Sequence, residues 1–196
     1  MSSRSLLPAF GLSGVGKTRL LAQLEANIPN CVRLSVSDLM TTAQKMTTVG
    51  PDYLRMLPKE KILENQEYVV TEIRKASISV KNQLILLDAH SVIDNFLELI
   101  EVPVDIIRSL RPVSIVFIYD EPDNISKRRK DDSSRQRPSR TISELAVQQD
   151  IARETCSQYA RILSLTYHEV ASHDYNALKS IVLSHMTEIQ VNQRFR

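Results

Sequence analysis

The stretch Gly11-Leu-Ser-Gly-Val-Gly-Lys-Thr18 matches the pattern G-x-x-x-x-G-K-[ST] at every fixed position. Three of the chain's four glycines fall inside it, with an apolar run before it and an amphipathic run after it. In such a strand–loop–helix unit, successive backbone N–H groups point at phosphate oxygens, and the positive end of the helix adds attraction. The stretch therefore predicts a phosphate-binding loop of a nucleotide-binding protein, but it does not indicate which reaction follows.

The residues of this loop have distinct expected roles at a bound nucleotide. Lys17 can reach the β- and γ-phosphates, and the Thr18 hydroxyl can ligate Mg²⁺. The phosphates of ATP are expected to contact Gly11, Ser13, Gly14, Val15, Gly16, Lys17 and Thr18.

Outward from the loop, apolar runs alternate with amphipathic stretches along the whole chain. The expected strands are Leu6–Phe10, Cys31–Val36, Leu84–Leu87, Val113–Tyr119 and Ile162–Tyr167. The expected helices cover about 17–28, 38–48, 58–80, 103–110, 122–131, 141–160 and 174–190. This alternation predicts one α/β domain over residues 1–196, doubly wound around a parallel sheet. Pro8 conflicts with a central position for the first strand, because proline cannot donate to a sheet ladder.

Composition and charge exclude several classes of protein. Of the 196 residues, 42% are hydrophobic and 24% are charged, unlike disordered, collagen-like or membrane proteins. The segment Met1–Phe10 holds about five apolar residues, too few for a signal peptide, and Cys31 and Cys156 form no ligand cluster. We expect a cytoplasmic protein with two ordinary thiols. The positive charge is concentrated in one stretch of an otherwise mildly acidic chain, which favours an anion bound at one place over a nucleic-acid surface. The apolar runs are too short to span a membrane.

Three polar residues follow the apolar run Leu84–Leu87. Asp88 stands where a carboxylate at the carboxyl end of a strand can hold Mg²⁺ beside the phosphate loop, or else it caps the next segment. His90 and Ser91 lie just beyond it, and they either face the same crevice or are hydrogen-bonded structural groups.

The stretch Lys127–Arg140 gathers seven positive charges against two negative ones. A charged run of this kind is either a solvated helix or a mobile lid whose guanidinium groups close over transferring phosphates. Arg135, Arg137 and Arg140 are separated by Pro138 and small polar residues, which favours a lid loop. Arg153, on the following helix, either faces the same anions or forms a surface salt bridge.

Together these segments resemble the archaeal-type adenylate kinases, a branch of the P-loop nucleoside monophosphate kinases, over most of the chain. The family's loop Gly-Ile-Pro-Gly-Val-Gly-Lys-Thr is similar to Gly11–Thr18, with Leu-Ser in place of Ile-Pro. Its Gly-Asp-Leu/Met turn is similar to Ser37–Met40, its Arg-x-Leu-Pro to Arg55–Pro58, and its Asp-Thr-His-Ser to Asp88–Ser91. Its lid, Arg-Arg-x-Arg-Asp-x-x-Arg-x-Arg-Asp, is similar to Arg128–Pro138. The order and spacing of these motifs, more than any one of them, indicate the family.

The resemblance implies a five-stranded parallel sheet in the order 2-3-1-4-5, with a helical acceptor-binding insertion at about 38–80 and a lid at about 127–141. It also implies transfer of the γ-phosphoryl of ATP to AMP with Mg²⁺, and homo-oligomers that are often trimers. The acceptor side would be lined by Asp38, Arg55, His90 and Ser91. The metal would be held by Thr18 and Asp88. Lys17, Arg128, Arg135 and Arg137 would surround the transferring group, with Arg129 at the ATP phosphates. An acceptor phosphate oxygen is already a nucleophile, so positioning and charge neutralisation supply the catalysis.

Departures from the family pattern concern the lid and the acceptor side. Asp131 replaces a lid arginine, Pro138 an aspartate and Ala89 a threonine, and residues 92–100 replace a longer Gly- and Pro-rich segment. One alternative function is therefore a P-loop kinase of another small acceptor, in which Asp38 or Asp88 orients or deprotonates a hydroxyl. Another is a non-catalytic ATP-binding regulator that uses lid closure as a switch.

Overall fold

The computed structural model describes residues 5–39, 57–80, 83–133 and 137–194, and its centre is a five-stranded parallel sheet. The sheet strands are β1 (Ser5–Phe10), β2 (Cys31–Ser35), β3 (Leu84–Asp88), β6 (Ile115–Tyr119) and β7 (Tyr167–Ala171). They lie in the order β2-β3-β1-β6-β7. Counted along the chain among these five strands, this is the order 2-3-1-4-5, so the predicted fold class and topology are confirmed.

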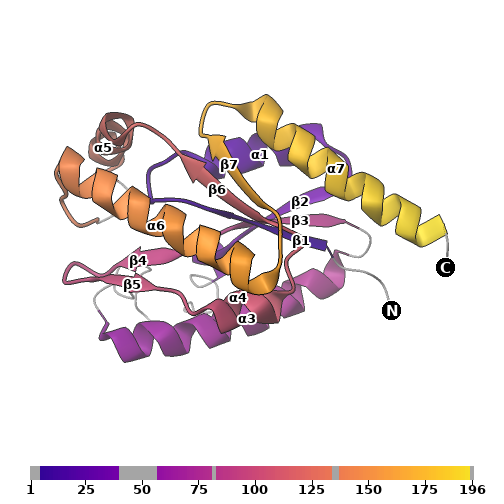
Figure 1. The fold of residues 1–196 in the computed structure, drawn as a ribbon, viewed down its shortest axis with the longest axis horizontal. Helices are drawn as coiled ribbons and strands as arrows, with labels where there is room; N and C mark the ends of the chain where they lie inside the picture. Colours follow the sequence, from indigo (N-terminus) through magenta and orange to yellow (C-terminus); the bar gives the residue numbers. More distant parts are fainter. Residues whose placement is uncertain (1–4, 40–56, 81–82, 134–136, 195–196) are drawn as a thin grey trace.

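Helices cover both faces of the sheet (Figure 1). One face carries α1 (Lys17–Asn27) and α7 (Tyr175–Arg194), and the other carries α3 (Lys59–Ser79), α4 (Val104–Leu110) and α6 (Ile142–Leu163). A further helix, α5 (Pro122–Asp131), lies beyond the carboxyl end of β6. None of the helices described is both long and apolar enough to cross a bilayer.

The central strands form the core because both of their faces are covered. All residues of β1 and β3 are buried, as the unbroken apolar run Leu84–Leu87 predicts for a strand inside a parallel sheet. Ala9 pairs with Asp88 of β3 on one side and with Val116 of β6 on the other. This register brings the end of β3 beside the loop that follows β1.

Pro8 is accommodated in the central strand by the way β1 pairs with its neighbours. The Ala9 carbonyl accepts a hydrogen bond from Ala89 next to β3, and the Leu6 carbonyl accepts one from Val113 next to β6. Because strand residues alternate in direction, the nitrogen of Pro8 faces β6. The described ladder to β6 begins only at Ala9, so proline removes a donor where the pairing is short.

The last predicted strand, Ile162–Tyr167, was wrong in position. Helix α6 continues to Leu163 and ends at Ser164, which takes a left-handed conformation (φ 54°), so β7 begins only at Tyr167. The apolar pair Ile162–Leu163 suggested a strand, but Ile162 is exposed on the last turn of the helix. The start of α6 is fixed by a capping box in which Thr141 and Glu144 each bond the other's backbone N–H.

A second sheet packs against α6, and the sequence did not predict it. It is the antiparallel hairpin of β4 (Val92–Asp94) and β5 (Leu99–Glu101). Asn95 closes its turn by accepting hydrogen bonds from the N–H groups of Leu97 and Glu98. The hairpin occupies the segment that departs from the family pattern.

The basic stretch begins on a helix, as the expected helix over 122–131 predicts. Residues 127–131 form the last part of α5, so a helix carries the first basic residues.

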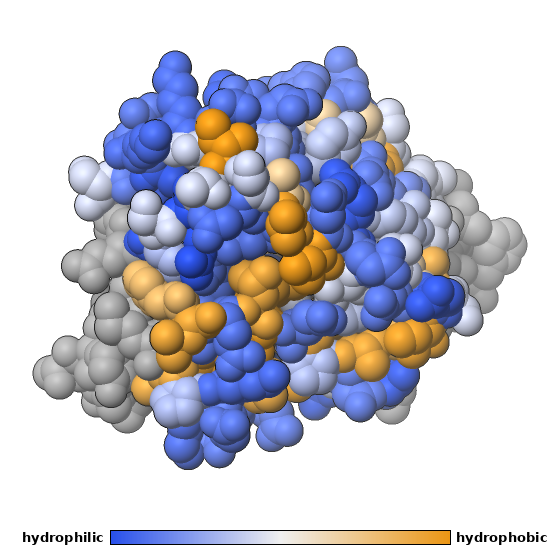
Figure 2. All heavy atoms as spheres, turned by 60° about the vertical axis from the view of Figure 1, so that its left-hand side comes forward, coloured by the Kyte–Doolittle hydropathy of each residue, from blue (hydrophilic) through white to orange (hydrophobic). Residues whose placement is uncertain are grey.

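Figure 2 shows the side of the molecule that lies to the left in Figure 1, where hydrophilic side chains dominate and apolar ones form a broken band. Elsewhere, Cys31 and Cys156 are buried and unbridged, and burial raises the pKa of both thiols to about 12.

Candidate active site

The loop between β1 and α1 has a backbone conformation that requires glycine at two of its positions. Gly11 and Gly14 have φ values of 149° and 86°, which side chains rarely allow. A Cβ on Gly11 would lie 2.3 Å from the carbonyl oxygen of Ile118, and one on Gly14 would lie 2.9 Å from Cγ of Arg129. The glycines are therefore fixed by close packing against β6 and α5 as well as by the turn itself.

Lys17 is the first residue of α1 and is 4% exposed. Its Nζ donates to the carbonyl oxygens of Gly11 (2.8 Å) and Leu12 (3.2 Å), and lies 4.0 Å from a carboxylate oxygen of Asp88. The ammonium group is thus folded over the loop, within the ring of backbone that would hold phosphate oxygens.

Thr18 and Asp88 meet where a magnesium ion is expected. The Thr18 hydroxyl donates to Asp88 Oδ2 over 2.6 Å, which joins the start of α1 to the end of β3. In the ranges the structure describes, no cluster of three or more His, Cys, Asp or Glu side chains forms a protein-only metal cage. The pair fits Mg²⁺, because that ion prefers oxygen ligands and takes few from protein when phosphates and water supply the rest.

Arg128 is held at the loop from α5. Its guanidinium donates to the carbonyl oxygens of Gly14 (3.1 Å) and Val15 (3.0 Å), and it forms an ion pair with Asp120 just after β6. Asp120 also accepts hydrogen bonds from Asn124 and Ser172. Burial alone would raise the pKa of Asp120, but these hydrogen bonds, together with Arg128 and the Glu121 N–H, lower it to about 2. Asp120 therefore stays charged and fixes Arg128, a role that the sequence did not reveal.

Two further lid arginines converge on Ser13. Arg129 Nε donates to the Ser13 carbonyl over 2.8 Å, and Arg137 Nε donates to the Ser13 hydroxyl over 3.0 Å. Arg137 is 9% exposed and pairs with Asp132. Its Nη1 is buried and has no partner among the residues described. A buried guanidinium N–H without an acceptor costs free energy, so an anion that accepts a hydrogen bond from Nη1 would bind favourably there.

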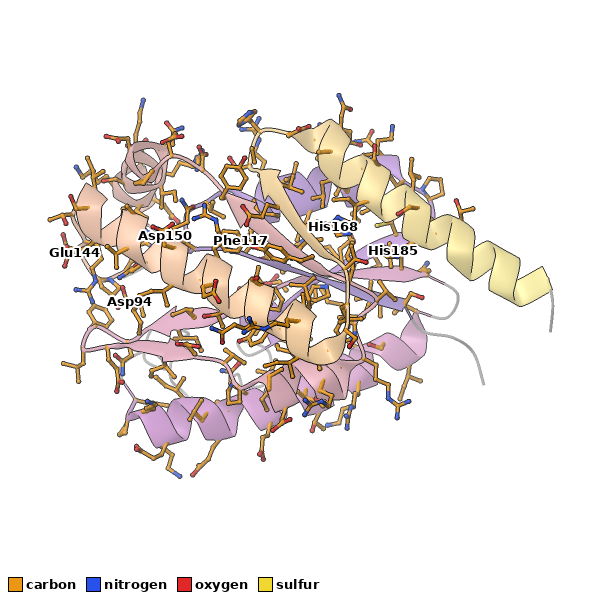
Figure 3. The ribbon with its side chains drawn as sticks, viewed as in Figure 1. Asp94, Phe117, Glu144, Asp150, His168 and His185 are labelled. Atoms are coloured by element: carbon orange, nitrogen blue, oxygen red, sulfur yellow. The ribbon has the colours of Figure 1, made fainter. Side chains whose placement is uncertain are left out.

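Arg140 lies at the end of the lid and is tied to the hairpin. It donates to both carboxylate oxygens of Asp94 (2.9 and 3.1 Å) and to the Phe96 carbonyl (3.2 Å). Gln148 of α6 donates to the same carboxylate over 2.9 Å. Burial opposes the charge of Asp94, but hydrogen bonds from Arg140, Gln148 and the Phe96 backbone lower its pKa. Figure 3 shows Asp94 below the first part of α6, which carries Glu144. Asp94 and Gln148 were not predicted, because Asp94 lies 46 residues from Arg140 and 54 residues from Gln148 in the sequence.

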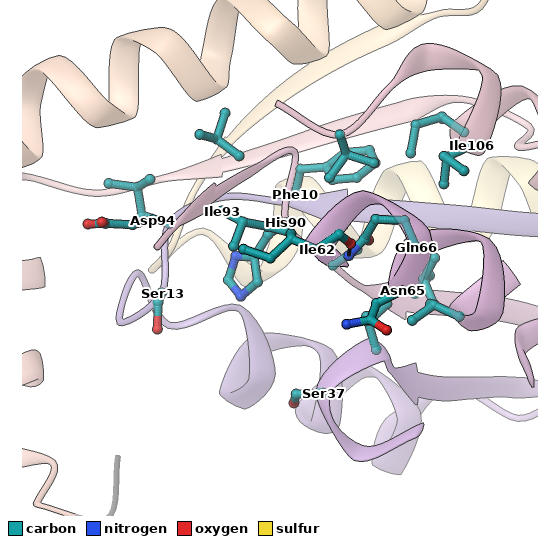
Figure 4. A pocket seen from close by; sticks show the side chains of 18 of the residues that line it. Phe10, Ser13, Ser37, Ile62, Asn65, Gln66, His90, Ile93, Asp94 and Ile106 are labelled. Carbon is teal, nitrogen blue, oxygen red and sulfur yellow. Dashed lines mark hydrogen bonds between the residues drawn. The ribbon is translucent and has the colours of Figure 1, made fainter. Parts of the chain in front are cut away.

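A cavity of about 190 Å³ opens beside the phosphate loop (Figure 4). Beside the loop it is lined by Ser13, Arg129 and Arg137, and its other polar lining residues are Ser37, Asp38, Asn65, Gln66, His90, Asp94 and Gln148. The rest is mostly aliphatic and comes from one face of α3, from α4 and from the sheet residues Phe10 and Leu87. The cavity therefore joins a cationic end near the loop to a long apolar end.

The predicted acceptor-side residues do not all lie in this cavity. Asp38 lines it, exposed and 3.9 Å from Arg33, and His90 lines it with Nδ1 2.8 Å from the Gly11 carbonyl. Ser91 is 1% exposed and donates to the Ala152 carbonyl of α6, so its hydroxyl contacts the core instead. Arg55 and Arg135 lie outside the described residues. Arg153 forms salt bridges with Asp150 and Glu169, the second of the two readings that the sequence left open.

The parallel sheet and the glycine loop define a P-loop nucleotide-binding protein. The family described as "AAA domain" matches residues 10–146, and the chain belongs to that family. The chain is 30% identical over 176 residues to an adenylate kinase of Pyrococcus abyssi, which covers 88% of each chain. It is 27% identical over 173 residues to one of Methanopyrus kandleri, covering 86% of this chain and 90% of that one. The resemblance to archaeal adenylate kinases is thereby confirmed.

A solved structure supports the fold alone. The tunicamycin resistance protein of Deinococcus radiodurans superposes with a TM-score of 0.52 at 12% identity, over 84% of this chain and 98% of that one.

Proposed function

We propose that this P-loop kinase transfers the γ-phosphoryl group of ATP to a nucleoside monophosphate, and that AMP is the preferred acceptor. The observation that carries the proposal is the convergence of Arg129 and Arg137 on Ser13, a residue of the phosphate loop that also lines the cavity. Cations at that junction can neutralise a group that passes from a donor on one side to an acceptor on the other. Relatives named adenylate kinase make AMP the first acceptor to test.

In this mechanism the protein positions charge and excludes water. Lys17 and the loop N–H groups would bind the donor phosphates, with Arg128 fixed beside them by Asp120. Thr18 and Asp88 would hold Mg²⁺, which when bound neutralises phosphate charge. Arg137 Nη1 would donate to the transferring group. The predicted roles are not tested for Arg55, Arg135, His90 and Ser91, and they stay predictions. The homo-oligomer and the cytoplasmic location also stay predictions.

The test is to mix the protein with ATP, Mg²⁺ and each of AMP, CMP, UMP and GMP, and to quantify diphosphates. Lys17→Ala should abolish transfer, because its ammonium lies inside the loop, while Lys179→Ala, a change on α7, should leave it intact. Equal turnover by wild type and Lys17→Ala would refute the donor site. ATP binding without transfer to any of the four would favour another acceptor, which the apolar end of the cavity also supports, or a binding regulator.

A further inference from the structure

One face of α3 carries polar residues where the helical pattern predicts apolar ones. The cavity is lined from this helix by Ile62, Asn65, Gln66, Val69, Val70 and Ile73. These positions recur at intervals of three and four, as the buried stripe of an amphipathic helix does. Four are aliphatic, and the two amides interrupt the stripe at its middle. Packing alone does not account for an amide pair at such positions.

The two amides retain most of their hydrogen-bonding capacity. Asn65 is half-buried, and its side chain makes no hydrogen bond to any residue that the structure describes. Gln66 is 8% exposed, and its Nε2 donates to the Ile62 carbonyl over 3.3 Å. That bond fixes the Gln66 side chain and leaves Oε1 to accept from a ligand. Because unpaired polar groups in an apolar site are costly, a ligand with matching groups is favoured there.

The other polar groups around the cavity have partners among the residues described. Asp94 binds both Gln148 and Arg140, and Arg129 and Arg137 lie at Ser13. Figure 4 shows Asn65 and Gln66 on α3, separated from Ser13 and Asp94 by the width of the site. The groups that would bind phosphate therefore lie at one end of the cavity. The amides of Asn65 and Gln66 lie at the other end, which would hold the rest of the acceptor.

We propose that Asn65 and Gln66 bind the edge of the acceptor's heterocyclic base and select a base with an exocyclic amino group. This inference rests on the proposed function. An amide offers a donor and an acceptor side by side, and the edge of adenine offers an N6 donor beside a ring-nitrogen acceptor. Gln66 Oε1 receives the amino group, while the aliphatic side chains of Val69 and Ile62 pack against the ring.

The experiment compares AMP with purine riboside 5′-monophosphate, which differs only by lacking the 6-amino group. For the wild type we expect kcat/KM to fall about tenfold from AMP to the analogue, since one neutral hydrogen bond is lost. Gln66→Leu and Asn65→Leu should bring that ratio toward one with the KM for ATP unchanged. Leucine suits an apolar helix stripe, so both variants should fold, which thermal unfolding checks.

The matched control is Gln158→Leu, the same change on α6, where the glutamine donates to Glu154 outside the cavity. Its AMP-to-analogue ratio should equal that of the wild type. If the wild type uses both monophosphates equally, or Gln66→Leu and Asn65→Leu keep the full ratio, the inference is wrong while the kinase function stands. If no monophosphate is phosphorylated, the proposed function fails, and calorimetry decides the inference: AMP must bind more tightly than the analogue, and the variants must lose the difference.

Discussion

The two ends of the site differ in how the chain builds them. At the phosphate end, one contiguous loop supplies the backbone, and Lys17, Thr18 and Arg128 are held by bonds to it or to β3. At the apolar end, residues from α3, α4, the hairpin and the sheet meet, and the Asn65 amide makes no hydrogen bond to a described residue. Phosphate binding is thus encoded locally, whereas the identity of the acceptor depends on side chains that only the fold brings together.

The largest expected effect comes from removing Arg137, the cation between the phosphate end and the apolar end of the site. Arg137→Ala should lower kcat by about 10³-fold, because an arginine at a transferring phosphoryl group contributes at least that much. The KM for ATP should change little, since the loop binds the donor. Initial rates at saturating ATP and AMP measure the effect. Arg161→Ala, a change near the end of α6, is the control; a loss of less than tenfold in Arg137→Ala would place the transferring group elsewhere.

The next largest effect tests the claim that the phosphate end is complete in itself. Asp88→Asn should raise the Mg²⁺ concentration needed for half-maximal activity by about 10–100-fold, as loss of a supporting carboxylate does at other metal sites. Binding of ATP without the metal should hardly change. A titration of activity against Mg²⁺ checks this, and an unaltered midpoint would contradict a metal role for Asp88 and leave it the capping role.

The ion pair of Arg140 and Asp94 links the end of the lid to the hairpin beside the site. Arg140→Ala leaves a largely buried carboxylate with Gln148 and the Phe96 N–H, so the free energy of unfolding should fall by about 2 kcal/mol. Urea unfolding at pH 7 measures it. Arg108→Ala removes a pair with Asp105 that is exposed on both sides, and it should cost less than about 0.5 kcal/mol. Equal losses in the two variants would mean that the hairpin and lid are not held together by this pair.

The same contrast separates what the sequence could predict from what it could not. The strand–loop–helix unit and the buried run of β3 follow from local patterns, whereas the strand order was implied by the resemblance to archaeal adenylate kinases. The structure confirms all three. The hairpin lacks a glycine turn, and its tip places Phe96 at a φ of 76°, which sequence rules disfavour for a bulky residue. The role of Asp94 could not be predicted, because its ion-pair partner Arg140 lies 46 residues later in the sequence. Long-range pairs of this kind are decided by packing.

The smallest expected effect concerns the stability of the far side of the molecule. Burial, and then the nearby His185, lowers the pKa of His168 on β7, far from Asp94 in Figure 3. As pH falls through about 6.5, the unfolded chain binds a proton that folded His168 resists, so stability decreases with acidification. His168→Gln should remove about 0.5 kcal/mol or less of the stability lost between pH 7.5 and 5.5. His173→Gln, a change in the exposed turn before α7, is the control. Urea unfolding at the two pH values checks it, and a variant as acid-sensitive as the wild type would assign the loss to other groups.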